Sequence, residues 1–137
     1  MQYTTSIIIH APIEKVWNLM SQIGAYSAWS SGVTDVEGTA ALGNKIKLYS
    51  EVSPGKAFPL KVTEFVPQQK MTFVGGMPLG LFKGTRMYTL AETAAGVQFT
   101  MTEVYTGPMA GMITNSIPNL TPSFEKFAQG LKAESEQ

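Results

Sequence analysis

Two charged residues, Arg86 and Glu103, have the types and the spacing that could do chemistry in this chain. Residues 82–93 and 96–106 are rich in aromatic, β-branched and Met side chains and flank a short link, which indicates a long antiparallel hairpin. Alternation along the second run places Glu103 on the same face as four apolar or aromatic side chains, those of Val97, Phe99, Met101 and Tyr105. A symmetric turn pairs Arg86 with Glu103, with their Cβ atoms about 5 Å apart. We therefore expect a cation and an anion side by side on an apolar inner surface.

The pair of Arg86 and Glu103 allows two interpretations. In the functional interpretation, the guanidinium offers planar hydrogen-bond donors to a carboxylate, enol or keto oxygen of a ligand. Glu103 then either orients the guanidinium or acts as a base. In the structural one, the two side chains form a closed internal ion pair that only fixes the register of the hairpin. A carboxylate with room for a ligand beside it would favour the first interpretation. A carboxylate walled off by Phe99 and Tyr88 would favour the second.

The other polar candidates are weaker. Glu64 is in phase with Val62 and Val66, so it either joins Arg86 inside or lies at the rim of the sheet. His10 is the only histidine and there is no cysteine, so neither a metal site nor histidine catalysis finds partners in the sequence. The sequence has no phosphate-binding loop, dinucleotide fingerprint or nucleophile elbow. We therefore expect no metal and no cofactor.

Composition narrows the classes of partner. The 137 residues fit one domain that can bury a core without disulfides. Ten basic residues balance ten acidic ones without clustering, which argues against nucleic acid and against an anionic membrane surface. The N-terminal apolar run is three residues long, too short for a signal peptide or a membrane span, so we expect no integral membrane association. A soluble cytoplasmic protein is the expectation, with a homodimer left open.

Hydrophobic periodicity predicts the elements that must hold these residues. Besides the hairpin, period-two patterns predict strands at residues 3–10, 33–37, 45–52, 57–66 and 70–75. Helical spacing predicts two short helices at residues 13–20 and 21–29, and a long terminal helix over residues 109–131. A single curved sheet gripping the terminal helix would bury the apolar faces of both.

Two segments are expected to depart from regular structure. Gly75 to Leu81 contains three glycines, a proline and exposed-looking apolar residues, which is typical of a mobile lip at a pocket entrance. Pro118 and Pro122 interrupt the terminal helix, so we expect a kink or break near residues 118–122, with Thr121 as a new N-cap. The polar tail at residues 132–137 is expected to fray.

Several stretches together carry a family likeness. The stretch IIIHAPIEKVWNLMSQIGAYSAWSSGV combines a first strand, Ala-Pro-x-Glu-x-Val-Trp, and an aromatic-Trp pair before the second strand. FKGTRMYTL and FTMTEVYTGPM look like the last two strands of the same type of domain, and FEKFAQGLK like its terminal helix. Over essentially its whole length the chain resembles START-like, or SRPBCC, domains of the polyketide cyclase/dehydrase branch.

The resemblance implies an α+β helix-grip (START-like) fold. Such a fold is a seven-stranded curved antiparallel sheet wrapped around a long C-terminal helix, with two short helices between strands 1 and 2 and a deep hydrophobic cavity. Many members of this branch carry His where Arg86 stands, so His-based proton transfer does not carry over. The resemblance places these residues around the cavity, although ordinary core packing also accounts for the apolar ones: Trp29, Glu64, Phe73, Arg86, Tyr88, Phe99, Met101, Glu103, Tyr105, Met109, Met112, Ile113 and Phe124.

Three functions are consistent with these patterns. The leading hypothesis is a single START-like ligand-binding domain over residues 1–137 that binds or transports a small hydrophobic molecule, lipid-like or polyketide-like, with one polar or acidic group. The alternative is a cofactor-free aromatase/cyclase or dehydratase in which Arg86 stabilises an enolate and Glu103 moves a proton. A third is a protein-interaction role, whose sign would be a solid interior and an exposed apolar patch around Leu79, Leu81 and Phe82.

Overall fold

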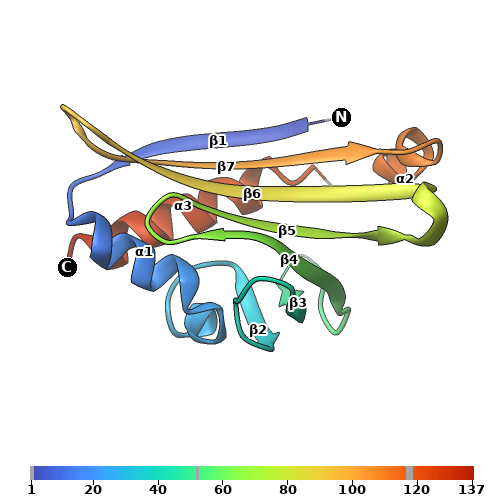
Figure 1. The fold of residues 1–137 in the computed structure, drawn as a ribbon, viewed down its shortest axis with the longest axis horizontal. Coiled ribbons are helices and arrows are strands. Elements are labelled where there is room, and N and C mark those ends of the chain that lie inside the picture. The colour runs from blue at the N-terminus through green and yellow to red at the C-terminus, as the bar shows by residue number, and fades with distance from the viewer. Residues whose placement is uncertain (1, 52, 117–118) are drawn as a thin grey trace.

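The computed structural model, which describes residues 2–51, 53–116 and 119–137, consists of one antiparallel sheet and the helices on its inner side (Figure 1). Seven strands pair in the order β1-β7-β6-β5-β4-β3-β2. The strands are β1 (Gln2–Ile9), β2 (Val33–Glu37), β3 (Lys45–Ser50), β4 (Phe58–Val66), β5 (Lys70–Met77), β6 (Phe82–Thr93) and β7 (Gly96–Thr106). The helices are α1 (Ile13–Ser21), α2 (Ala110–Ser116) and α3 (Thr121–Ser135), with 3-10 turns η1 (Ile23–Ala28) and η2 (Pro78–Gly80).

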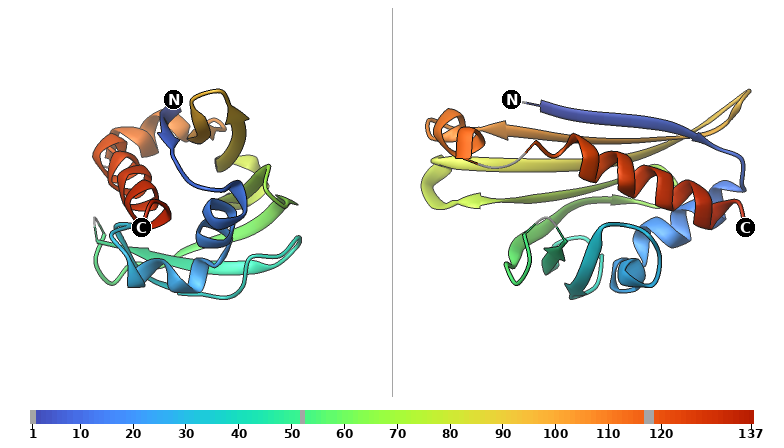
Figure 2. Two further views of the ribbon diagram at one scale, coloured as in Figure 1. Left: turned by 90° about the vertical axis from the view of Figure 1, so that its left-hand side faces the viewer. Right: turned by 180° about the vertical axis from the view of Figure 1, so that it is seen from behind.

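The sheet curls so that its concave side faces α1 and α3, as both views in Figure 2 show. Along α3, Phe124, Phe127, Ala128 and Leu131 are buried, because these positions form one stripe at helical spacing. On β7 the inner positions alternate with outer ones, as the period of two requires. The predicted seven-stranded helix-grip fold, with two short helical segments between β1 and β2, is confirmed.

The central hairpin of β6 and β7 has the predicted register. Glu92 pairs with Val97, and Arg86 lies opposite Glu103. The link closes symmetrically between Thr93 and Gly96, where the Thr93 hydroxyl donates to the Gly96 carbonyl at 2.8 Å. Because a slip of one residue would turn every side chain to the other face, this link decides that Glu103 points inward.

The terminal helical region is two helices, α2 and α3, rather than one. The N-cap of α3 is Leu120, without a side-chain cap hydrogen bond, so the prediction of Thr121 as the N-cap is wrong by one residue; the backbone N–H of Thr121 instead donates to the Asn119 side-chain oxygen at 3.0 Å. Thr121 is the first helical residue, and Pro122 lies in the first turn, where its missing N–H costs nothing. The predicted break is therefore confirmed, while Pro118 itself lies outside the described residues.

The lip expected at Gly75 to Leu81 is shorter than predicted. Gly75 and Gly76 belong to β5, where they pair with Gly84 and Lys83 of β6. Only Pro78 to Leu81 leave the ladder, and Leu79 at the tip is 94% exposed with a φ of 62°. The prediction of a seven-residue connector is wrong because glycines can remain in a strand when the partner strand pairs with them.

The tail is held more firmly than its polar sequence predicted. Lys132 donates to the Ile8 carbonyl at 2.9 Å, and the Glu136 carboxylate accepts from the His10 backbone N–H at 2.8 Å. The His10 hydrogen bond and then the Lys132 ammonium lower the pKa of Glu136. The end of α3 is thereby tied to the end of β1.

This contact predicts a pH-dependent contribution to stability. The pKa of Glu136 is lower in the folded protein than in the unfolded chain, where it is about 4.3. Ionised Glu136 therefore stabilises the fold at pH values above about 4.3, and this stabilisation is lost as the pH falls through the pKa of the folded state. Glu136→Gln should therefore be less stable than wild type in urea unfolding at pH 7 and equal to it near pH 3. Glu125→Gln, an exposed position on α3, is the matched control. A difference that persisted at pH 3 would contradict an electrostatic origin.

Candidate functional site

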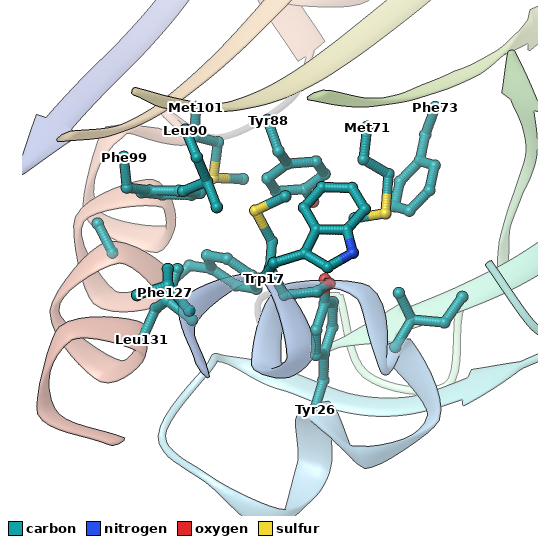
Figure 3. Close-up of a cluster of buried hydrophobic side chains, with 14 of the residues drawn as sticks. Trp17, Tyr26, Met71, Phe73, Tyr88, Leu90, Phe99, Met101, Phe127 and Leu131 are labelled. Carbon is teal, nitrogen blue, oxygen red and sulfur yellow. The ribbon is translucent and has the colours of Figure 1, made fainter. Parts of the chain in front are cut away.

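The space between the sheet and the helices has a filled part and a hollow part. Figure 3 shows the filled part, where side chains of α1, η1, β5, β6, β7 and α3 meet. Trp17 and Tyr26 are buried there, and the Tyr26 hydroxyl donates to the Met20 carbonyl. The Tyr26 ring lies 5.2 Å from that of Phe127, edge to face, which is a favourable aromatic geometry. This half of the molecule is ordinary core.

The hollow part is a cavity of about 500 Å³ between the inner face of the sheet and the α2–α3 region. Leu48 and Ser50 of β3 line one side, and the loop after β3 adds Lys56. Helices α2 and α3, together with Leu120 just before α3, cover it with Ile113, Ser123, Phe124 and Phe127. Strands β6 and β7 form the floor with Arg86, Tyr88, Met101, Glu103 and Tyr105. Its size and its largely apolar wall are those of a small-molecule site.

Arg86 and Glu103 form an ion pair on the floor of this cavity. The Arg86 Nη2 donates to Glu103 Oε2 at 2.7 Å, and the side chains are 19% and 10% exposed. The guanidinium carbon also lies 5.1 Å from the centre of the Phe124 ring, a cation–π contact from α3. Within the described part of the chain, the buried Nε of Arg86 has no hydrogen-bond partner. The pair is therefore only partly satisfied by the protein.

The charge state of this floor follows from its surroundings. Burial lowers the pKa of Arg86, but the Glu103 carboxylate and Tyr88 together raise it more, so the net shift is upward and the guanidinium stays charged. Burial raises the pKa of Tyr88. Burial, followed by the negative charge of Glu103, raises the pKa of Tyr105. Both phenols therefore remain neutral hydrogen-bond donors near a charge-neutral ion pair.

Gly84 keeps space open beside the carboxylate. A Cβ atom at this position would lie 3.3 Å from the Tyr105 ring and 3.6 Å from Glu103 Oε1. Gly84 lines the cavity together with Glu103 and Tyr105. A larger residue there would stand between the ligand space and the carboxylate. The carboxylate is thus bonded to Arg86 without being walled off.

Seven of the predicted site residues line the cavity together: Arg86, Tyr88, Met101, Glu103, Tyr105, Ile113 and Phe124. Phe73 and Phe99 face the same way but belong to the filled part, where each is fully buried. Trp29 packs on Phe127 at 5.2 Å between ring centres. Met109 precedes α2 and donates its backbone N–H to the Leu81 carbonyl at 2.9 Å. These four residues support the cavity from outside its lining.

Two predicted residues point away from the cavity. The register of β4 shifts between Val62 and Glu64, so the alternation that puts Val62 inside does not continue to Glu64. Glu64 lies on the rim and pairs with Lys70 at 3.0 Å. Met112 is 64% exposed on α2, because Ile113 takes the inward position of that short helix. Glu64 thus takes the rim position, one of the two that its sequence left open, whereas the inward placement predicted for Met112 is wrong.

Several residues that line the cavity were not predicted from the sequence. Leu48 and Ser50 carried a usable signal, since alternation in residues 45–52 places both on one face. Leu60, Ser123 and Phe127 also line the cavity, and their sequence pattern did not distinguish lining from core. Phe58 and Met77, which are 39% and 41% exposed, mark where the cavity meets solvent.

Two features are absent from the residues that the structure describes. No helix among them is long and apolar enough to cross a membrane. Residues 2–51, 53–116 and 119–137 also contain no group of three or more His, Cys, Asp or Glu side chains placed to hold a metal ion.

Comparison with solved structures shows the same fold in proteins of low sequence identity. A hypothetical protein of Helicobacter pylori has a TM-score of 0.79 at 13% identity, covering 98% of this chain and 88% of that one. The Aha1 dimer of Colwellia psychrerythraea has a TM-score of 0.75 at 17% identity, covering 99% and 96%. DynU16, a putative protein of the dynemicin biosynthetic locus, has a TM-score of 0.69 at 15% identity, covering 96% and 46%.

The sequence assigns the chain to a family, which the structural comparisons alone do not do. No curated protein matches it. The model of the family described as polyketide cyclase / dehydrase and lipid transport matches residues 1–136, and the chain therefore belongs to this family.

Proposed function

We propose that the protein binds and carries a small, largely apolar molecule in the cavity between the sheet and α3, without catalysis. The observation that supports this most is the hollow half of the interior, about 500 Å³ lined mainly by apolar side chains. The family description, which includes lipid transport, is consistent with such a role. We expect the whole of residues 1–137 to act as one ligand-binding domain.

The polar floor suggests how one end of the ligand is oriented. Arg86 and Glu103 neutralise each other, so this floor suits a neutral carbonyl or hydroxyl group more than a second charge. The phenols of Tyr88 and Tyr105 add donors in the same region. A carbonyl or hydroxyl oxygen of the ligand would accept hydrogen bonds from these groups, while the rest of the ligand lies against Met101, Phe124 and the other apolar residues that line the cavity.

A thermal-shift screen against fatty acids, sterols and aromatic polyketides tests binding. A ligand present at 100 times its Kd should stabilise the fold by about 2.7 kcal/mol, which raises the melting temperature measurably. Failure of every compound class to shift the melting temperature would count against the proposal.

Filling the cavity provides a sharper test. Ser123 lines the cavity from α3, so Ser123→Phe should occupy part of the ligand space and weaken binding at least about tenfold, or about 1.4 kcal/mol. Gln129→Phe places the same side chain on the exposed face of α3 and should leave affinity unchanged. Both affinities can be measured by titration with the best compound from the screen. Equal losses in the two variants would place binding elsewhere.

A second candidate is a cyclase or dehydratase. One observation favours it: because Gly84 has no side chain, the Glu103 carboxylate can be reached from the cavity. Product analysis after incubation with aromatic polyketides separates the candidates. Recovery of unchanged compound supports a carrier, and a cyclised or dehydrated product supports an enzyme.

The protein-interaction alternative has less support. Leu79 and Leu81 are exposed, but half of the interior is hollow and Phe82 lines the cavity, contrary to the solid interior which that alternative requires. Homodimerisation and a cytoplasmic location stay predictions. A structural neighbour described as a dimer makes the first worth testing by size-exclusion chromatography.

A further inference from the structure

The cavity has polar side chains at two separate places. One place is the floor on β6 and β7, which carries the ion pair and two phenols: Arg86, Glu103, Tyr88 and Tyr105. The other place is at the end of β3 and in the loop after it, next to Phe58, where the cavity meets solvent. We call this second place the mouth. Its polar residues are Ser50, Ser53 and Lys56.

Strands β4 and β5 separate the floor from the mouth. The strand order puts both of them between β3 and β6, so that β3 and β6 are three strand spacings apart, or about 14 Å along the sheet. The cavity residues that β4 and β5 contribute are apolar or glycine: Phe58, Pro59, Leu60, Gly75, Gly76 and Met77. The cavity therefore suits a molecule with two polar ends and an apolar middle.

Lys56 carries the one charge of the lining that the protein does not neutralise. Of the described residues around the cavity, three are charged, and two of them, Arg86 and Glu103, form the ion pair on the floor. In the part of the chain that the structure describes, no carboxylate lies within 4 Å of the Lys56 ammonium. Glu51, the acid of the same loop, is paired with Lys126 at 2.6 Å. The lining thus has one net positive charge, and that charge lies at the mouth.

A tight turn determines where Lys56 lies. The Lys56 backbone N–H donates to the Ser53 carbonyl at 3.2 Å, which closes the turn. Pro54 occupies the second position of this turn, and Gly55, with a φ of 74°, occupies the third, as in a type II turn. The start of the loop is fixed as well, because the Glu51 backbone N–H donates to the carbonyl of the residue before β2 at 3.0 Å. Lys56 is therefore held at the mouth by a defined loop.

A single ammonium at the mouth of an apolar cavity favours a monoanion. A carboxylate carries one negative charge at pH 7, which balances the net charge of the lining, whereas a phosphate monoester carries about 1.5 to 2. Because Lys56 is exposed, a carboxylate beside it keeps part of its hydration, which lowers the cost of binding a charge. The Ser53 hydroxyl lines the same place and can donate a second hydrogen bond.

We propose that the ligand is an apolar molecule with an uncharged oxygen at one end, bound on the floor by Arg86 and the phenols, and a carboxylate at the other end, bound at the mouth by Lys56. This inference rests on the proposed binding function. It adds the chemical class of the ligand, its direction in the cavity and the residue that binds its charged end. Hydroxy and oxo carboxylic acids with an aliphatic chain belong to this class.

Isothermal titration calorimetry of the full chain with three ten-carbon compounds tests the proposal: decanol, decanoate and 10-hydroxydecanoate. The last should bind most tightly, because it alone has both polar ends, whereas a hydroxyl buried without a partner would make it weaker than decanoate. Lys56→Gln should weaken both acids about two- to fivefold, the effect of one exposed ion pair, and leave decanol unchanged. Lys56→Glu should weaken the acids further, because it places a like charge beside the carboxylate.

Lys61→Gln is the matched control, because Lys61 is also an exposed lysine, on β4, but does not line the cavity. Binding of all three compounds should be the same in this variant as in wild type. Equal losses for the acids in Lys61→Gln and Lys56→Gln would show that only the overall charge of the protein matters, which would overturn the proposal. Binding of the acids that does not change in Lys56→Gln would overturn it as well.

The floor is tested in the same titrations. The double variant Arg86→Met with Glu103→Leu should remove the advantage of 10-hydroxydecanoate over decanoate, while Lys56→Gln still weakens both acids in that background. If the double variant weakens decanoate and Lys56→Gln does not, the carboxylate lies on the floor, and the proposed direction is wrong.

The outcomes also separate this inference from the proposed function. If none of the three compounds binds while another compound of the thermal-shift screen does, the proposed class of ligand is wrong and the binding function stands. Equal binding of all three compounds, unaffected by Lys56→Gln, likewise overturns only the class and the direction. If no compound of either experiment binds, the proposed function itself fails.

Discussion

Arg86→Met is expected to lower the free energy of unfolding by about 3 kcal/mol at pH 7. The substitution leaves the Glu103 carboxylate on an apolar floor without its partner, and breaking a buried pair from one side typically costs about 3–5 kcal/mol. The lower end applies because Glu103 is 10% exposed to the cavity. Loss of the Phe124 contact adds to the effect. Urea unfolding of wild type and variant measures the difference.

The double variant Arg86→Met with Glu103→Leu separates structure from function. Removing both charges leaves no unpaired group, so stability should return to within about 1 kcal/mol of wild type. If the pair also orients a ligand, the double variant should fold normally and still bind a carbonyl or hydroxyl compound at least about tenfold more weakly. If the double variant has normal stability and unchanged affinity, the ion pair does not orient a ligand and serves only to fix the register of the hairpin.

Local patterns in the sequence were sufficient to predict the hairpin and its ion pair. Residues 82–93 and 96–106 each follow the period of two, and the symmetric closure at Thr93 and Gly96 fixes every cross-strand partner, including Arg86 with Glu103. The strand at residues 33–37 was likewise predicted at its observed bounds. The conformation of these elements is determined by residues that are close in the sequence, so the periodicity of apolar residues is sufficient to predict them.

Features that depend on distant segments could not be predicted in this way. A register shift in β4 turns Glu64 to the rim, and only its pairing with β5 shows it. Phe73 and Phe99 face inward as expected, but α1 and η1 fill that half of the concave side, so these rings meet side chains instead of a ligand space.

Gly130→Ala is expected to be among the most disruptive single substitutions, although alanine is the better helix former. Gly130 lies in the middle of α3, where glycine costs about 1 kcal/mol relative to alanine. An added Cβ would lie 2.0 Å from the Ser30 carbonyl oxygen and 3.2 Å from the Trp29 ring. The first contact is with backbone, which a rotamer change cannot relieve. The helix would have to move away from residues 29–30, at a cost of about 3 kcal/mol or more.

Gly111→Ala on α2 is the matched control, since a Cβ there meets nothing within 4 Å. It should be neutral or stabilising by up to about 1 kcal/mol, because alanine restricts the unfolded chain more than glycine does. Urea unfolding of both variants measures the two effects, and near-UV circular dichroism reports the packing of Trp29 against Phe127. Since α3 also covers the cavity through Ser123 and Phe124, Gly130→Ala should also weaken binding of the best compound from the thermal-shift screen. If Gly130→Ala unfolds like wild type, α3 does not approach Ser30 this closely, and its position over the cavity is different.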